Sequence, residues 1–122
     1  MLTHIKFVSV PTRDQDRALA FWTEKVGLRV VTDQPFDGKQ RWIELRFPNR
    51  VDTGLVLFTP EGHESRIGTF FAGSLAADDV RATYEELKAK GVEFESEPKE
   101  QPWGTFAIMK DADGNQFVIS SR

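Results

Sequence analysis

The sequence predicts an α+β fold of two tandem βαβββ modules that form a curled, mostly antiparallel mixed sheet with a cleft. The first observation is an internal repeat: Arg17-Ala18 and Gly27 recur 64 positions later as Arg81-Ala82 and Gly91. The second is the order of elements, because each half runs from an apolar strand through an Asp and an amphipathic helix to a Gly and further strands. The third is the length of 122 residues, which suits one domain. We therefore expect a single domain over residues 1–122, with halves of about 1–59 and 68–122 and a linker over 60–67.

In the first half, residues 5–10 are rich in β-forming side chains and end at Pro11, which predicts a strand. Asp14 is the expected cap of a helix whose apolar residues recur at helical spacing up to Gly27. Residues 28–32, 40–47 and 54–59 have the composition of strands, with a turn at Asp37-Gly38 between the first two.

The second half repeats this order. Residues 69–76 predict a strand, Asp78 is the expected cap, and the next helix carries Val80, Tyr84 and Leu87 on one face until Gly91. Strands are expected over 92–95, 104–110 and 115–120, and the last two are joined by a tight turn that begins at Asp111.

Composition excludes several classes of function. The net charge is −3 and no run of basic residues occurs, which argues against nucleic acid as a partner. There is no Cys, so disulfides and thiolate chemistry are excluded. The apolar stretches are too short to cross a bilayer and no charged-then-apolar leader is present, so we expect a cytoplasmic protein with no membrane partner.

Two motifs carry a family resemblance. The first helix begins Asp-Gln-Asp-Arg-Ala-Leu-Ala-Phe-Trp over residues 14–22, and the late turn reads Lys-Asp-Ala-Asp-Gly-Asn-Gln-Phe over residues 110–117. Together with the doubled βαβββ order, they resemble the vicinal oxygen chelate superfamily, which includes glyoxalase I, extradiol dioxygenases, metallothiol transferases and bleomycin-resistance proteins. The resemblance covers essentially the whole chain and implies the fold, but one fold carries many chemistries.

The same resemblance implies where a metal would bind. Metal-dependent members hold a divalent ion with four side chains, and those positions fall here on Phe7, Glu44, Ala72 and Val118. Three of these residues have no lone pair to donate, and one carboxylate does not hold a divalent ion. We therefore expect no metal and no cofactor. His4 is expected at a surface or edge, and His63 in a solvated loop.

A set of rings replaces the metal ligands. Strand alternation places Trp42, Glu44 and Arg46 on one face, and the same parity and the repeat bring further apolar side chains to it. Trp103 follows Pro102 at the start of its strand, where it could cover the cleft. The expected ligand-binding residues are Phe7, Ser9, Trp42, Glu44, Arg46, Ala72, Trp103, Phe106 and Val118. The alternative is that the apolar members simply fill a core between sheet and helices.

Glu44 has three interpretations, because a carboxylate in an apolar strand is costly unless it is paired or hydrated. It is a general base, an anchor for a cationic ligand group, or the structural partner of Arg41 or Arg46.

These residues lead to a principal hypothesis. It is a glyoxalase/bleomycin-resistance-like protein that binds a small aromatic or cationic molecule in an apolar cleft without metal. A glyoxalase-like lyase or isomerase, or a dioxygenase-type enzyme that uses Glu44, is the alternative, and a scaffold without ligand is a third. A homodimer is expected, since pairing would cover exposed sheet edges.

Overall fold

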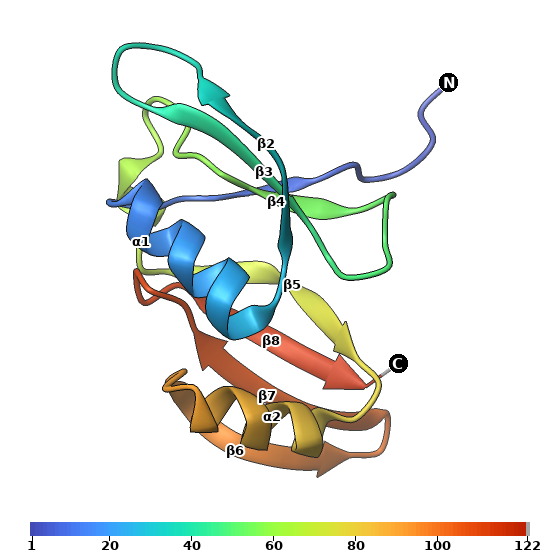
Figure 1. The fold of residues 1–122 in the computed structure, drawn as a ribbon. Coiled ribbons are helices and arrows are strands. Elements are labelled where there is room, and N and C mark those ends of the chain that lie inside the picture. Colours follow the sequence, from blue (N-terminus) through green and yellow to red (C-terminus); the bar gives the residue numbers. More distant parts are fainter. Residues whose placement is uncertain (122) are drawn as a thin grey trace. The chain divides into compact units, whose positions relative to one another are not determined.

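A computed structural model describes residues 1–121, which fall into two compact units (Figure 1). The first unit is Met1–Ile67 and the second begins at Gly68. Each unit contains one helix-and-sheet module in the order β-α-β-β-β, which confirms the α+β fold and the tandem arrangement expected from the repeat. No helix within residues 1–121 is long and apolar enough to cross a membrane.

The first unit forms a four-stranded mixed sheet. The elements of this unit are β1 (Val8–Val10), α1 (Gln15–Ala20), a π-helical turn η1 (Phe21–Val26), β2 (Arg29–Pro35), β3 (Arg41–Arg46), β4 (Gly54–Leu57) and a 3-10 turn η2 (Glu64–Arg66). The strands lie in the order β1-β4-β3-β2, with β1 parallel to β4 and the other pairs antiparallel. The 3-10 turn η2 lies in the segment expected to be a linker.

Both ends of the first helix follow the sequence signals. The Asp14 carboxylate accepts a hydrogen bond from the backbone N–H of Arg17 at 3.1 Å, as an N-cap does. Gly27 closes the π-helical turn with a φ of 94°, a left-handed conformation that glycine adopts at little cost.

The second unit has the same topology. Its elements are β5 (Phe70–Ala77), α2 (Val80–Ala89), β6 (Phe94–Gln101), β7 (Gly104–Lys110) and β8 (Gln116–Ser121). The sheet has the order β5-β8-β7-β6, with β5 parallel to β8, and α2 packs against β6, β7 and β8.

One helix cap differs from the sequence prediction. Asp79, not Asp78, caps α2: its carboxylate accepts a hydrogen bond from the backbone N–H of Ala82 at 3.0 Å. The internal repeat aligned Asp78 with Asp14, but β5 continues to Ala77 and α2 begins at Val80. Two adjacent acids offer equivalent side chains, so only the position of the first helical turn selects between them.

The late turn is held by one buried carboxylate. Asp111 Oδ1 accepts hydrogen bonds from the backbone N–H groups of Asp113 and Asn115, both at 2.9 Å, and Oδ2 accepts one from the Asn115 side chain. Burial raises the pKa of Asp111, and these hydrogen bonds oppose the rise. Asn115 Oδ1 in turn accepts from the backbone N–H of Gly68 at 2.7 Å, which ties the turn to the start of the unit.

Each unit buries the apolar face of its helix against its sheet. In the first unit this core comprises Val10, Ala18, Phe21, Trp22, Leu28, Ile43, Leu45, Leu55 and Leu57, and Val56 and Phe58 are buried as well, on the other face of the sheet. In the second it comprises Val80, Tyr84, Leu87, Val92, Ala107, Met109, Phe117 and Ile119.

The first residue of α1 fixes the ends of two strands. Gln15 Nε2 donates to the carbonyl oxygens of Arg41 and Leu57, both at 2.8 Å, and its Oε1 accepts from the Arg41 N–H at 2.9 Å. The Gln15 amide therefore completes backbone hydrogen bonding at the ends of β3 and β4 and sets where the helix meets the sheet.

Replacement of Gln15 by Met should lower the free energy of unfolding by about 1–3 kcal/mol, because three backbone groups lose their partner. Urea unfolding followed by circular dichroism measures this. Gln101→Met, at an exposed position of β6, is the matched control and should change stability by less than about 0.5 kcal/mol. Equal effects of the two substitutions would contradict the role of Gln15.

Candidate functional site

Strand β3 divides its side chains between two faces of the first sheet. Ile43 and Leu45 are fully buried in the core, and Trp42, Glu44 and Arg46 lie on the opposite face. This division is the one that strand alternation predicts. The candidate site lies on the face that carries Trp42, Glu44 and Arg46.

Neighbouring strands extend the same face. Glu44 lies opposite Val56 of β4 and opposite Thr32 of β2, and Ser9 of β1 is also opposite Val56. Because paired residues in a sheet point to the same side, Ser9 and Glu44 share one face across three strands.

Four rings gather at one end of this face, and we refer to Phe7, Phe36, Trp42 and Phe58 as the aromatic cluster. Trp42 contacts the other three, with ring centroids 5.6 Å from Phe7, 5.7 Å from Phe36 and 5.3 Å from Phe58. Phe36 also meets Phe58 edge to face at 5.1 Å. These spacings lie in the range of favourable ring pairs, so the four side chains form one apolar wall.

Two members of the cluster were not among the expected site residues. Phe36 lies just before the Asp37-Gly38 turn, and Phe58 follows the last residue of β4. Strand alternation could have identified both rings. Phe36 is two positions beyond Gln34, which pairs with Trp42, and so lies on the same face. Phe58 is two positions beyond Val56, which pairs with Glu44, and lies on that face too.

A polar chain runs along β3 beside the cluster. The Trp42 indole N–H donates to Glu44 Oε1 at 3.4 Å, and Glu44 Oε2 forms an ion pair with Arg46 Nη2. The Glu44 and Arg46 side chains are only 11% and 9% exposed. Of the three interpretations of Glu44, the structure shows a pair with Arg46.

Arg41 is engaged elsewhere. Its guanidinium lies 2.9 Å from Asp16 and 3.0 Å from Asp33. It therefore belongs to the surface of the first unit and takes no part in the Glu44 pair.

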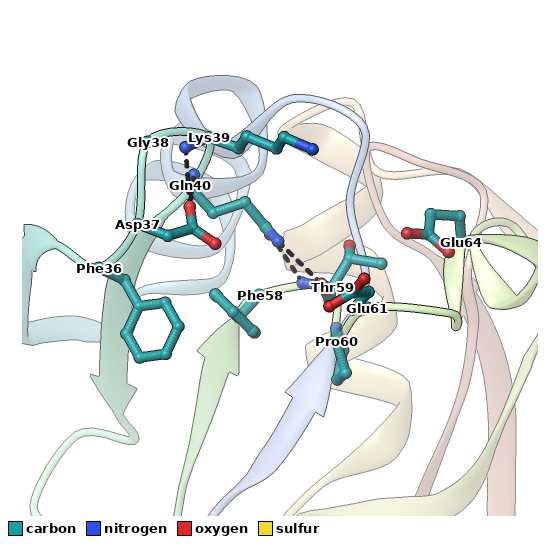
Figure 2. Close-up of a pocket in the computed structure, with 10 residues that line it drawn as sticks. All are labelled: Phe36, Asp37, Gly38, Lys39, Gln40, Phe58, Thr59, Pro60, Glu61 and Glu64. Atoms are coloured by element: carbon teal, nitrogen blue, oxygen red, sulfur yellow. Dashed lines mark hydrogen bonds between the residues drawn. The ribbon is translucent and has the colours of Figure 1, made fainter.

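An open pocket of about 720 Å³ adjoins the aromatic cluster and shares Phe36 and Phe58 with it (Figure 2). Its volume is in the range of small-molecule sites. Pro60 adds to the apolar lining, whereas the charged lining residues are three acids and one base. The complete lining is Phe36, Asp37, Gly38, Lys39, Gln40, Phe58, Thr59, Pro60, Glu61 and Glu64.

Hydrogen bonds fix the two walls of this pocket. Gln40 Nε2 donates to the Thr59 carbonyl at 2.8 Å, and the Thr59 N–H donates to Gln40 Oε1 at 2.9 Å (Figure 2). Asp37 Oδ1 accepts from the backbone N–H groups of Gln40 and Lys39, both at 2.7 Å, and these bonds lower the pKa of Asp37. The Asp37 side chain is therefore a carboxylate at neutral pH.

Two of the expected site residues of the second unit, Phe106 and Val118, lie on one face of its sheet. Phe106 pairs with Ser120, and Ile108 with Val118, which also lies opposite Ser74. Trp103 is 64% exposed and stacks on Phe106 with ring centroids 5.6 Å apart. Ala72 is exposed in the irregular stretch of β5 between Phe70 and Ser74.

The residues present do not fit a divalent metal. At the four positions that the family resemblance assigns to ligands, Phe7, Ala72 and Val118 offer no donor atom, and Glu44 is already paired with Arg46. Within residues 1–121, no three His, Cys, Asp or Glu side chains are grouped as a metal site requires.

Neither histidine belongs to this site. His4 is exposed before β1 and lies 3.0 Å from the Thr3 hydroxyl, and His63 is exposed at the start of η2.

Comparison with known proteins places the chain in a family. The family profile described as Glyoxalase/Bleomycin resistance protein/Dioxygenase superfamily matches residues 3–119. The uncharacterized protein YetH of Bacillus subtilis is 37% identical over 122 residues, with 98% of each chain covered.

Two solved structures share both sequence and fold with this chain. UcmS2 is 35% identical with a TM-score of 0.86, and 98% of each chain is covered. TnmS3, an antibiotic binding protein from Streptomyces sp. CB03234, is 32% identical with a TM-score of 0.86, covering 98% of this chain and 96% of its own. The chain therefore belongs to the glyoxalase/bleomycin resistance protein/dioxygenase superfamily.

Proposed function

We propose that this protein binds a small aromatic or cationic molecule, without a bound metal, against the aromatic cluster and in the adjoining pocket. The cluster carries the proposal: four rings line one end of a sheet face, and Phe36, which is 60% exposed, belongs to both cluster and pocket. An exposed ring gains by stacking with a planar ligand, because both surfaces leave water.

The charges around the pocket favour a cationic group on the ligand. Asp37, Glu61 and Glu64 face a single base, Lys39, among the lining residues. A positive group placed among these carboxylates and over the Phe36 ring would gain from both Coulomb attraction and the cation–π interaction.

Related structures support binding rather than a particular ligand. TnmS3, with 32% identity and nearly full coverage, is described as an antibiotic binding protein. By this similarity we propose that the ligand of the present protein belongs to the size class of small natural products, which suits a pocket of about 720 Å³.

The state of Glu44 favours binding over catalysis. A general base must be reached by the substrate's proton at hydrogen-bond distance. Here both carboxylate oxygens have partners, the Trp42 indole and the Arg46 guanidinium. A lyase, isomerase or dioxygenase that uses Glu44 would have to bring its substrate to a carboxylate that is only 11% exposed and already holds two partners.

The cytoplasmic location expected from the sequence stays a prediction.

A matched pair of probes tests the ligand class. 1-Methylnaphthalene and the N-methylquinolinium ion have the same shape and differ in charge. We expect both to quench tryptophan fluorescence, and Trp42→Ala to weaken their binding by about 1–3 kcal/mol through loss of ring contact. Val51→Ala, at an exposed position outside the pocket, should leave both affinities unchanged. If neither probe binds, or Trp42→Ala lowers only thermal stability, the rings serve the core alone.

The cationic preference has its own test. Glu64→Gln removes one charge from the pocket, so it should raise the Kd of N-methylquinolinium several-fold and leave that of 1-methylnaphthalene unchanged. Glu24→Gln makes the same change in net charge at an exposed position outside the pocket and should affect neither. Titration calorimetry at two salt concentrations measures these differences. An equal effect of both variants would contradict a local electrostatic role.

Metal analysis of the purified protein tests the proposal that it binds no metal. After dialysis against buffer containing zinc, nickel or iron, the purified protein should hold well under one equivalent per chain by plasma mass spectrometry, because the ligand positions lack donors. A content near one ion per chain that Glu44→Ala abolishes would overturn the metal-free proposal.

We also propose that the protein is a homodimer. Strands β1 and β2 form the edges of the first sheet, and β5 and β6 those of the second. The β2 edge carries exposed Val30 and Val31, which a second copy could cover. Light scattering should give twice the chain mass of 13.9 kDa, and a mass near 13.9 kDa at every concentration would contradict this.

A further inference from the structure

The position that would supply a metal ligand in the family carries its own cation in this chain. Glu44 is the carboxylate that remains of the four ligand positions, and the Arg46 guanidinium pairs with it two residues along the same strand. We propose that Arg46 takes the place of a metal in neutralising Glu44 and that, through Glu44, it is a positioning residue for the indole of Trp42. Trp42 contacts a ligand only under the proposed function, so any effect of Arg46 on ligand binding rests on that function.

The contacts form an unbroken chain. Arg46 Nη1 donates to the Leu45 carbonyl at 3.3 Å, Nη2 pairs with Glu44 Oε2, and Glu44 Oε1 accepts from the Trp42 indole N–H at 3.4 Å. The two carboxylate oxygens therefore serve different partners, one on each side. A carboxylate that is held by a guanidinium has a fixed direction, and the indole N–H meets it in that direction.

Burial makes this pair different from other ion pairs of the unit. Both side chains are about one-tenth exposed, whereas in the pair of Arg50 with Asp52 both are more than half exposed and the atoms lie 3.9 Å apart. Charges away from water interact strongly, and loss of one partner leaves the other buried without compensation. Loss of Arg46 would therefore leave the Glu44 carboxylate buried and unpaired, whereas loss of a surface arginine leaves its partner in water.

The adjacent strand leaves room for the guanidinium. Gly54 of β4 is the register partner of Arg46. A Cβ at position 54 would collide with the Leu45 carbonyl oxygen and would lie 2.8 Å from Nη1 and 3.1 Å from Cδ of Arg46. The glycine therefore lets the Arg46 side chain lie against the strand pair, where it reaches Glu44.

The indole signals of the ligand-free protein test this directly. The chain has three Trp residues, and Trp42→Phe identifies the Trp42 Nε1–H resonance in a ¹H–¹⁵N spectrum. In Arg46→Met, that proton should move upfield and exchange faster with water, in the same direction as in Glu44→Ala, because the carboxylate is no longer held toward it. The Trp22 and Trp103 signals should stay in place.

Controls separate positioning from general stability. Arg50→Met removes an exposed ion pair and should move none of the three indole signals. Arg46→Lys keeps a cation and should restore part of the wild-type shift. Arg46→Gln removes the charge and shortens the side chain but keeps a polar head group; it replaces Arg46→Met if that variant does not fold, and its Trp42 signal must also move upfield. An unmoved Trp42 signal in a folded neutral variant would overturn the proposal.

A second measurement tests the replacement of the metal. Mn²⁺ broadens resonances near its binding site, so a wild-type protein in which Arg46 neutralises Glu44 should show no selective broadening of the Trp42 indole signal. Selective broadening that Glu44→Gln abolishes would overturn the proposal. Neither measurement uses a ligand, so failure here leaves the binding function standing. Failure of both probes to bind would contradict the binding function alone.

Discussion

Alternation along β3 is the constraint on which both the core and the candidate site depend. Ile43 and Leu45 are fully buried in the core, so Trp42, Glu44 and Arg46 must occupy the other face. A slip of one residue would exchange the two sets and place both charges of the ion pair among the apolar side chains that pack on the helix. Gln15 binds the backbone at Arg41 and opposes such a slip, because its amide matches one register only. The register that places Ile43 and Leu45 in the core therefore also determines which side chains form the site.

The fold could be predicted from the sequence largely because the chain repeats itself. Doubling of the helix pattern gave the element order, and Gly27 marked a helix end that the structure has in a left-handed conformation. Strand ends were harder. β1 is shorter than expected, whereas β2 and β6 extend into polar residues up to Pro35 and Gln101. Such edge strands are long because they pair with a hairpin partner, and this tertiary effect overrides local propensity.

The candidate site could be predicted only in part. Strand parity placed Trp42, Glu44 and Arg46 together, and the same parity selects Arg46 over Arg41 as the partner of Glu44, since position 41 lies on the other face. The pocket could not be predicted in this way. Its walls are a turn and the segment after β4, and the Gln40–Thr59 hydrogen bonds hold them together. No periodic pattern in the sequence predicts such hydrogen bonds.

Gly54 serves two neighbours at once. A Cβ at position 54 would collide with the Leu45 carbonyl oxygen of the paired strand, so the β3–β4 pairing requires the glycine whatever residue stands at position 46. The same missing Cβ leaves the space that the Arg46 guanidinium occupies. The pairing of β3 with β4 and the ion pair on β3 thus both depend on the absence of one carbon atom.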